Sequence, residues 1–214
     1  MTTPAGQPEV SLVFPSHYPE AAAMLGRAFA DDPLMKAILP PGLTLDQRAG
    51  RAGLIFDVAL RGQRSEGQPI FGVMHQGKVA AAAVIEQVTR VPSMMTVAVG
   101  ALPTLPSLLR GAGPRGVIRA MSALDAIMRH RPPEPHLYLN ILGVEPALQR
   151  RHFGVTLLER LRRETALRHD LIGVYLETAT EANVAYYTHV GYEVIGEFHP
   201  IGVCMWRMLQ RRSV

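Results

Sequence analysis

The stretch that decides the fold covers residues 144 to 154 and reads Val-Glu-Pro-Ala-Leu-Gln-Arg-Arg-His-Phe-Gly. It follows an apolar run, His136 to Val144, which is typical of a buried strand, and it opens a strongly amphipathic segment, which is typical of a helix. The first amides of a helix have no partner within the helix, and the helix dipole is positive at that end. Arg150 and Arg151 add formal charge to the same turn. The stretch therefore predicts a site for the diphosphate of a cofactor.

Composition narrows the class of protein. The chain has 214 residues, of which 48% are hydrophobic, as expected for one globular domain over residues 1–214. The net charge is +4, but the arginines are scattered, and this distribution disfavours a nucleic-acid partner. Cys204 is the one cysteine and the eight histidines lack zinc-ligand spacing, so we expect neither a disulfide nor a metal site. Without a visible leader or a run of roughly 20 apolar residues, a cytoplasmic protein with no membrane partner is expected.

Hydrophobic periodicity predicts the elements of secondary structure. The predicted strands cover residues 10–14, 69–74, 79–85, 137–144, 172–178, 192–198 and 203–208, and the predicted helices cover 19–30, 44–60, 116–130, 153–168 and 182–190. Thr44 and Gln47 form a capping-box pattern at the start of the second helix. The buried stripe of that helix is predicted as Leu54, Ile55, Val58 and Ala59. Residues 102–114 are interrupted by proline and glycine and are assigned no element.

The order of these elements predicts the fold class. The strand, helix and strand between residues 137 and 178 imply a parallel pair with a right-handed crossover. The turn at residues 75–78, with Gly77, and the last two strands imply antiparallel hairpins. We therefore expect an α/β (α+β) domain with a mixed, mostly antiparallel central sheet of about seven strands, flanked by helices.

Two segments together form a family pattern. The first is Val144-Glu145-Pro146 followed by residues 149–154, and the second, residues 183–192, reads Asn-Val-Ala-Tyr-Tyr-Thr-His-Val-Gly-Tyr. They resemble the Val-x-Pro, Gln/Arg-x-x-Gly-x-Gly/Ala and Asn-x-x-x-Tyr-x-x-x-Gly-Phe/Tyr motifs of the GNAT superfamily of acyl-CoA-dependent N-acetyltransferases. A weaker similarity covers residues 28–34, and the order of elements agrees over nearly the whole chain. The resemblance implies a single GNAT-like domain whose splayed strand pair admits the pantetheine arm of acetyl-CoA.

The resemblance also implies a set of cofactor-binding residues. These are Leu142, Gly143, Val144, Gln149, Arg150, Arg151, His152, Phe153, Gly154, Val155 and Asn183. Asn183 has an alternative role as a helix N-cap. His152 stands where the family has its first glycine, and the consequence depends on the backbone. A helical φ tolerates histidine, whereas a positive φ costs on the order of 1 kcal/mol.

Tyr187 is the candidate general acid that the resemblance implies, because it lies four residues before Gly191. Coenzyme A leaves as a thiolate, and thiols have a pKa of about 8.5, so a phenol can ease its departure. The alternative is that the Tyr187 ring only packs against the sheet. The general base stays open among Glu177, Asp31, Asp32, His136 and water.

The implied activity is transfer of an acetyl group from acetyl-CoA to a primary amine of a small molecule, a peptide or a protein. Two alternatives stay open. The chain could be a non-catalytic sensor that binds acyl-CoA, or it could use a longer donor such as succinyl-CoA. A homodimer is also compatible with the sequence.

Overall fold

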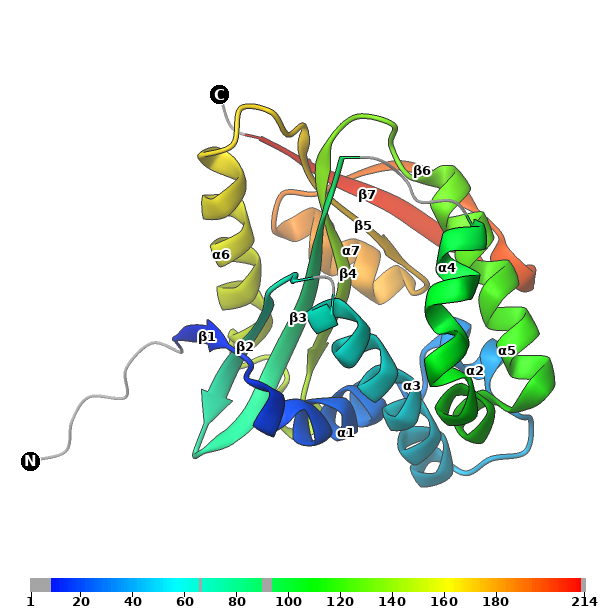
Figure 1. Cartoon of the computed structure of the whole chain (residues 1–214). Coiled ribbons are helices and arrows are strands. Elements are labelled where there is room, and N and C mark those ends of the chain that lie inside the picture. The colour runs from blue at the N-terminus through cyan, green and yellow to red at the C-terminus, as the bar shows by residue number, and fades with distance from the viewer. Residues whose placement is uncertain (1–8, 66, 90–93, 213–214) are drawn as a thin grey trace, which may run out of the picture.

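A seven-stranded sheet forms the centre of the described residues, 9–65, 67–89 and 94–212, in the computed structural model (Figure 1). The strands are β1 Val10–Leu12, β2 Ile70–His75, β3 Lys78–Val88, β4 His136–Val144, β5 Gly173–Thr178, β6 Glu193–Phe198 and β7 Met205–Arg211. Their order across the sheet is β1-β2-β3-β4-β5-β7-β6. The pair β4–β5 is parallel and the other neighbours are antiparallel. The predicted fold class is confirmed.

Helices cover both faces of this sheet (Figure 1). They are α1 Tyr18–Ala28, α2 Pro33–Ile38, α3 Leu45–Ser65, α4 Met94–Ala101, α5 Leu105–His130, α6 Phe153–Ala166 and α7 Glu181–His189. Short 3₁₀ turns are η1 Pro15–His17, η2 Leu102–Thr104, η3 Pro146–Leu148 and η4 Pro200–Gly202. One apolar core joins α6 and α7 to the sheet, and a second core joins α1, α2 and α3 to it.

The predicted capping box opens α3, but the predicted buried stripe of this helix is wrong. The Thr44 amide donates to Gln47 Oε1 over 3.0 Å, and the Gln47 amide donates to Thr44 Oγ1 over 3.3 Å. Leu54 is 41% exposed, and the rest of the predicted stripe is half-buried. The buried face consists of Ala52, Phe56 and Leu60. The reason is tertiary: α3 packs closely against α1, so the contact between the two helices decides which face of α3 is buried.

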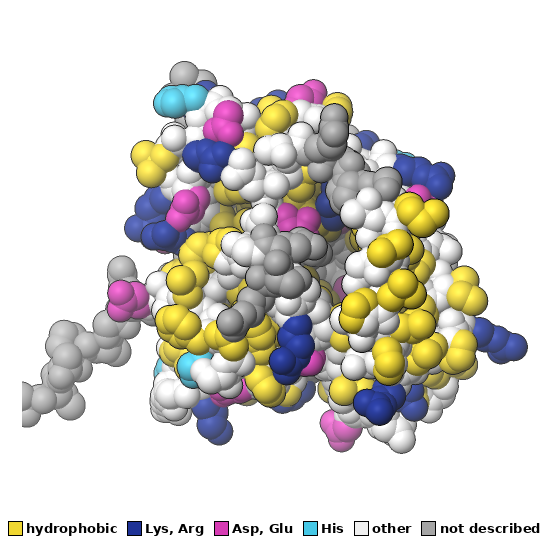
Figure 2. All heavy atoms as spheres, viewed as in Figure 1, with side chains coloured by type: hydrophobic (Ala, Val, Ile, Leu, Met, Phe, Trp, Pro, Cys, Tyr) yellow, Lys and Arg dark blue, Asp and Glu magenta, His cyan; other side chains and the backbone are white. Residues whose placement is uncertain are grey.

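The region from residue 94 to 114 is helical although proline and glycine interrupt it. It forms α4, η2 and the first half of α5, which is kinked at Gly113 (φ 72°) and Pro114. Hydrophobic side chains gather over α4 and the start of α5 (Figure 2), and Met95 is 73% exposed. The short helix α2 was also not predicted, although Asp32 as N-cap and Pro33 at the first position were a signal for it.

The strands β4 and β5 separate toward their carboxyl ends. Two register pairs join them, Leu137 with Val174 and Tyr138 with Tyr175. On its other side β4 carries a bulge, because the pairing of β3 skips Asn140. Bulges are common next to functional sites, since they re-aim side chains. The splayed pair is therefore present, and it opens the sheet where the motif stretch begins.

Candidate active site

A cavity of about 870 Å³ lies at the splayed ends of β4 and β5. Its walls come from the end of β4, the loop and first turn of α6, α7, and the end of α1. It is lined by Tyr187 and by every predicted cofactor residue except Arg151. Arg151 is exposed. The fold thus brings the two motif segments, distant in sequence, to one cavity, while the binding role of each residue stays a prediction.

Sequence reasoning missed part of this wall. The additional lining residues are Ala28, Phe29, Thr180, Tyr186, His189 and Val190. Asp31 and Asp32, two of the candidate bases, also line this cavity at the α1–α2 turn. A signal was available for α7, because Asn183, Tyr186, Tyr187 and Val190 follow the three- and four-residue spacing of one helix face. For Phe29 the sequence showed only the weak family similarity of residues 28–34, because its place in the wall depends on how α1 packs on the sheet.

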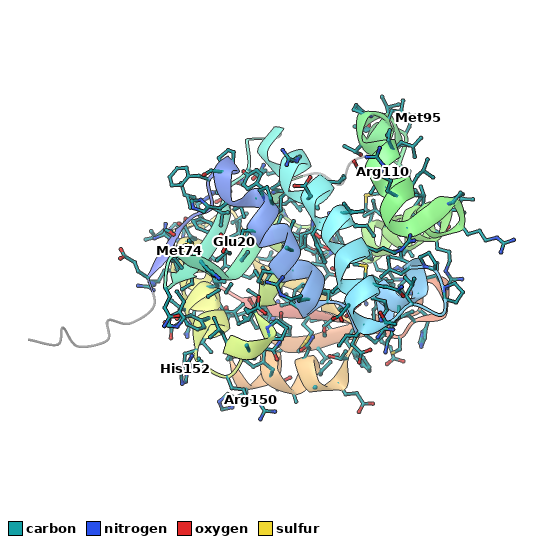
Figure 3. The ribbon with its side chains drawn as sticks, turned by 90° about the horizontal axis from the view of Figure 1, so that it is seen from below. Glu20, Met74, Met95, Arg110, Arg150 and His152 are labelled. Carbon is teal, nitrogen blue, oxygen red and sulfur yellow. The ribbon has the colours of Figure 1, made fainter. Side chains whose placement is uncertain are left out.

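The loop before α6 has an unusual backbone. Arg150 and His152 have φ values of 61° and 65°, and His152 is the N-cap of α6 without a side-chain capping bond. Its carbonyl accepts the Thr156 amide over 2.9 Å, so the amides of the first turn are not used within the helix. Figure 3 shows Arg150 and His152 close together beside the start of α6 and near α7. Histidine at position 152 therefore adopts the left-handed conformation that glycine favours.

Replacing His152 with glycine should give a more stable protein than replacing it with alanine, by about 1 kcal/mol. Both changes remove the imidazole ring, but only alanine keeps a Cβ at positive φ. Chemical denaturation of the two variants measures the difference. Equal stabilities, or a more stable alanine variant, would show that the left-handed conformation of residue 152 carries no cost.

Tyr187 is buried within a cluster of aromatic rings. Its ring centroid lies 5.3 Å from that of Tyr186 and 5.5 Å from that of Tyr192, and 8% of the residue is exposed. Burial raises the pKa of the Tyr187 hydroxyl, and the neighbouring Tyr186 raises it further. The hydroxyl is therefore protonated at neutral pH and is available as a donor.

Asn183 is not the N-cap of α7, so that alternative is wrong. The cap is Thr180, whose Oγ1 accepts the Asn183 amide over 3.2 Å. Thr180 has the extended backbone that an N-cap requires. Asn183 lies one turn into the helix and lines the large cavity.

A second cavity, of about 180 Å³, adjoins the first. The two cavities share Phe29, Asp32, Leu142, Asn183 and Tyr187. The smaller one is bounded by β4, β5 and the α1–α2 region, with further walls from α3, α5 and β7. Tyr187 thus lies at the junction of two spaces, which is the arrangement that a two-substrate reaction needs.

Of the candidate bases, Glu177 and Asp32 line the smaller cavity. Burial raises the pKa of Glu177 to about 7, although the charge of Arg131 and the hydroxyls of Tyr138 and Tyr175 favour its ionised form. Burial also raises the pKa of Asp32, whose carboxylate accepts the Met35 amide over 3.0 Å.

The two remaining candidates are placed less favourably for a base. Asp31 is exposed and pairs with Lys36 and Arg48 at 3.0 and 3.2 Å. His136 is fully buried and lines neither cavity, and its Nδ1 bonds to the Glu134 carbonyl. Burial lowers the pKa of the His136 ring. The sequence showed the residue types, but the fold places Glu177 and Asp32 at the smaller cavity and His136 away from it.

Comparison with known proteins identifies the fold. No protein-family model matches the sequence, and no curated protein matches it either. Solved structures match over nearly the full chain, and they are GCN5-related N-acetyltransferases. The chain has the GNAT fold, as the motifs predicted.

Three solved structures illustrate the similarity. One from Corynebacterium glutamicum, described as histone acetyltransferase HPA2 and related acetyltransferase, has a TM-score of 0.68 at 19% identity and covers 97% of both chains. The polyamine N-acetyltransferase of Drosophila melanogaster has a TM-score of 0.63 at 17% identity, with 96% of this chain and 100% of that chain covered. Arylalkylamine N-acetyltransferase 2 of Aedes aegypti also scores 0.63, at 13% identity, with 97% and 100% covered. At these identities the similarity concerns the fold.

Two further observations concern the described residues alone. No cluster of three or more His, Cys, Asp and Glu side chains suited to a metal ion occurs among them. None of their helices combines the length and the apolar character that crossing a membrane requires.

Proposed function

We propose that this chain is an N-acetyltransferase that moves an acetyl group from acetyl-CoA to a primary amine. The observation that carries the proposal is the pair of adjoining cavities that meet at Tyr187, at the splayed ends of β4 and β5. One space is large and borders a helix N-terminus, as a diphosphate cofactor requires. The other is small and contains carboxylates, as a cationic acceptor requires.

The large cavity fits coenzyme A in its chemistry. Its wall includes the first turn of α6, whose free amides and helix dipole favour a diphosphate. Gly154 lies in this turn, and a Cβ there would be 3.2 Å from the Tyr186 hydroxyl. Glycine at this position therefore keeps this part of the cavity open. Leu142, Gly143 and Val144 follow the last β4–β5 register pair, and their backbone groups would bind the pantetheine arm.

Tyr187 would act as the general acid. It lies at the junction of the two spaces, and its buried hydroxyl is protonated. Donation from this hydroxyl to the leaving sulfur would lower the barrier for breaking the carbon–sulfur bond. Asn183 on the same helix would contact the cofactor arm, as the motif resemblance implies.

The acceptor class is an amine of a small molecule or of a peptide or protein. Structural neighbours are named for a polyamine, for arylalkylamines and for an alanine of a ribosomal protein. These names support amines as a class. One domain over residues 1–214, a cytoplasmic location, the absence of nucleic-acid and membrane partners, and a homodimer stay predictions.

Calorimetry and a thiol-release assay test the proposal. Acetyl-CoA should bind with a Kd in the micromolar range. Gly154→Val should weaken this binding at least tenfold, because a branched side chain would fill the part of the cavity beside Tyr186. Gly50→Val is a matched control, since a Cβ at Gly50 meets no atom within 4 Å. An absence of heat at high micromolar acetyl-CoA would contradict the proposal.

The two alternatives give different results in the same assays. A sensor would bind acetyl-CoA but release no thiol with any amine. A transferase for longer acyl groups would release thiol faster with succinyl-CoA than with acetyl-CoA.

A further inference from the structure

Large apolar side chains gather on the outside of α4, η2 and the start of α5 (Figure 2). Single exposed apolar side chains are ordinary on a protein surface, whereas a contiguous group marks a surface that contacts another molecule. Six of the thirteen exposed large hydrophobic side chains among the described residues form this apolar patch: Met95, Val99, Leu102, Leu105, Leu109 and Ile118. None of the six lines either cavity of the candidate active site.

Helix α4 has no buried side. Its sequence, Met94–Ala101, contains no charged residue, and none of its eight residues is buried. A helix that is hydrophobic all round is normally enclosed in a protein core or in lipid. The described residues of this chain do not enclose α4, so we expect an external apolar partner to cover it.

The start of α5 packs on α3 through small residues and leaves its larger apolar side chains outside. Gly111 and Ala112 are buried, and a Cβ at Gly111 would lie 3.0 Å from Ile55 Cγ1 of α3. Arg51 Nη1 on α3 donates to the carbonyls of Arg110 and Gly111 over 3.1 and 3.2 Å. The inner face of this helix is therefore already packed, and the apolar patch is not an unfinished part of the core.

The same segment carries the positive charge of the chain. Between Gln87 and Leu124 the sequence has no Asp, Glu, Lys or His, and its charged residues are Arg90, Arg110, Arg115 and Arg119. The net charge of the whole chain is +4, so this segment accounts for the entire excess. Arg110, Arg115 and Arg119 are exposed, and Figure 3 shows Arg110 and Met95 at the same end of the molecule. The apolar patch is therefore bordered by positive charge and suits an anionic partner.

These features distinguish among the possible occupants of the patch. A two-fold contact with a second copy would place the positive segments of both copies against each other, which is unfavourable. Nucleic acid binds basic groups on its phosphates, and large apolar side chains at the centre of the surface would not serve it. A groove of another protein covers one face of a helix, whereas α4 has no buried face. An anionic lipid surface accepts apolar side chains among its acyl chains and arginines at its phosphates.

We propose that α4, η2 and the start of α5 bind the surface of an anionic lipid bilayer. Met95, Val99 and Leu102 enter the boundary between headgroups and acyl chains, while Arg110 and Arg115 contact the lipid phosphates. The chain then lies on the membrane without crossing it. The inference departs from our prediction of no membrane partner, which considered leader and spanning segments only. It does not depend on the proposed acetyltransferase function.

Sedimentation of the full-length chain with lipid vesicles tests the proposal. Binding to vesicles of phosphatidylcholine and phosphatidylglycerol, mixed at about 3:1, should be at least tenfold stronger than binding to phosphatidylcholine alone at about 0.1 M salt. Met95→Ser combined with Val99→Ser should weaken binding to the anionic vesicles at least tenfold, because apolar area is lost from the patch. Arg110→Gln combined with Arg115→Gln should weaken it by a similar factor and reduce the preference for anionic lipid.

Matched control variants make the same chemical changes away from the patch. Leu167→Ser removes an apolar side chain that is 81% exposed at the end of α6. Arg162→Gln combined with Arg163→Gln removes two exposed positive charges from α6. Both controls should bind anionic vesicles within about twofold of the wild type. Every substituted side chain is exposed, so all variants should unfold at the wild-type temperature.

A fluorescent probe measures insertion separately from adsorption. Cys204 is the one cysteine, so Cys204→Ser allows a single label at a chosen position. An environment-sensitive fluorophore attached at Met95→Cys should shift its emission to the blue when the anionic vesicles are added. The same fluorophore at Leu167→Cys should show no shift, because that position lies outside the patch.

Three results would overturn the proposal. The first is equal binding to the anionic and the neutral vesicles, and the second is wild-type binding by the Met95→Ser, Val99→Ser variant. The third is a dimer in sedimentation velocity without lipid that this variant abolishes, because the patch would then belong to a second copy of the chain. Acetyl transfer in solution is unaffected by any of these outcomes, so the proposed function is tested independently.

Discussion

Replacing Tyr187 with phenylalanine is expected to lower kcat at least tenfold, while the KM for acetyl-CoA changes little. The substitution removes the buried hydroxyl at the junction of the two cavities but keeps the ring that packs against Tyr186 and Tyr192. A hydroxyl that assists departure of the thiolate acts in the transition state, so its loss affects kcat more than binding. A tenfold loss corresponds to about 1.4 kcal/mol of transition-state stabilisation.

Tyr192→Phe is the matched control for this experiment. Tyr192 contacts the Tyr187 ring and is also buried, but it lines neither cavity, and its hydroxyl has no hydrogen-bond partner among the described residues. Its loss should leave kcat within about twofold of wild type. An unchanged kcat in Tyr187→Phe would remove the proposed acid role and leave Tyr187 as a packing residue.

Replacing Gly26 with alanine is expected to destabilise the fold by about 3 kcal/mol. A Cβ at Gly26 would lie 2.3 Å from the Ala49 carbonyl oxygen and 2.8 Å from the Gly53 amide nitrogen, and both are backbone atoms of α3. Backbone cannot move aside as a flexible side chain can, so α1 and α3 would have to separate. Denaturant unfolding would measure the loss, and activity should fall as well because α1 leads into Phe29 and Asp32 at the cavities.

Gly50→Ala makes the same substitution on the partner helix as a control. A Cβ there meets no atom within 4 Å, and alanine is the better helix former by up to about 1 kcal/mol. This variant should be as stable as wild type or more stable. If both variants lost the same stability, close α1–α3 packing would not be the cause.

Local pattern was sufficient for much of the fold. From residue 137 onward, the predicted strands and helices match the observed ones to within about three residues at each end. Leu157, Leu158, Leu161 and Thr165, which are spaced along one face of α6, are buried. Such elements are predictable because apolar residues recur every second position in a half-buried strand and about every 3.6 positions in an amphipathic helix. The capping box of α3 was equally visible, since both partners lie within one turn.

The predictions of helix position and burial were wrong where contacts with a distant segment of the chain determine the local structure. The buried face of α3 depends on its crossing with α1, and the helical course of residues 94–114 continues despite proline and glycine. Both depend on contacts between elements, which residue spacing within a single element does not record.

In the candidate site, too, some features were predictable from the sequence and others depend on the tertiary structure. The sequence was enough to select the two motif segments around Gly154 and Tyr187, because a helix N-terminus after a strand is an anion site wherever it occurs. It was not enough to settle the backbone of His152, the role of Asn183 or the choice among the bases. The φ of residue 152 follows from how the loop joins a splayed strand to α6. The raised pKa of Glu177 arises from its burial in the folded chain, and burial is a property of packed neighbours rather than of the residue.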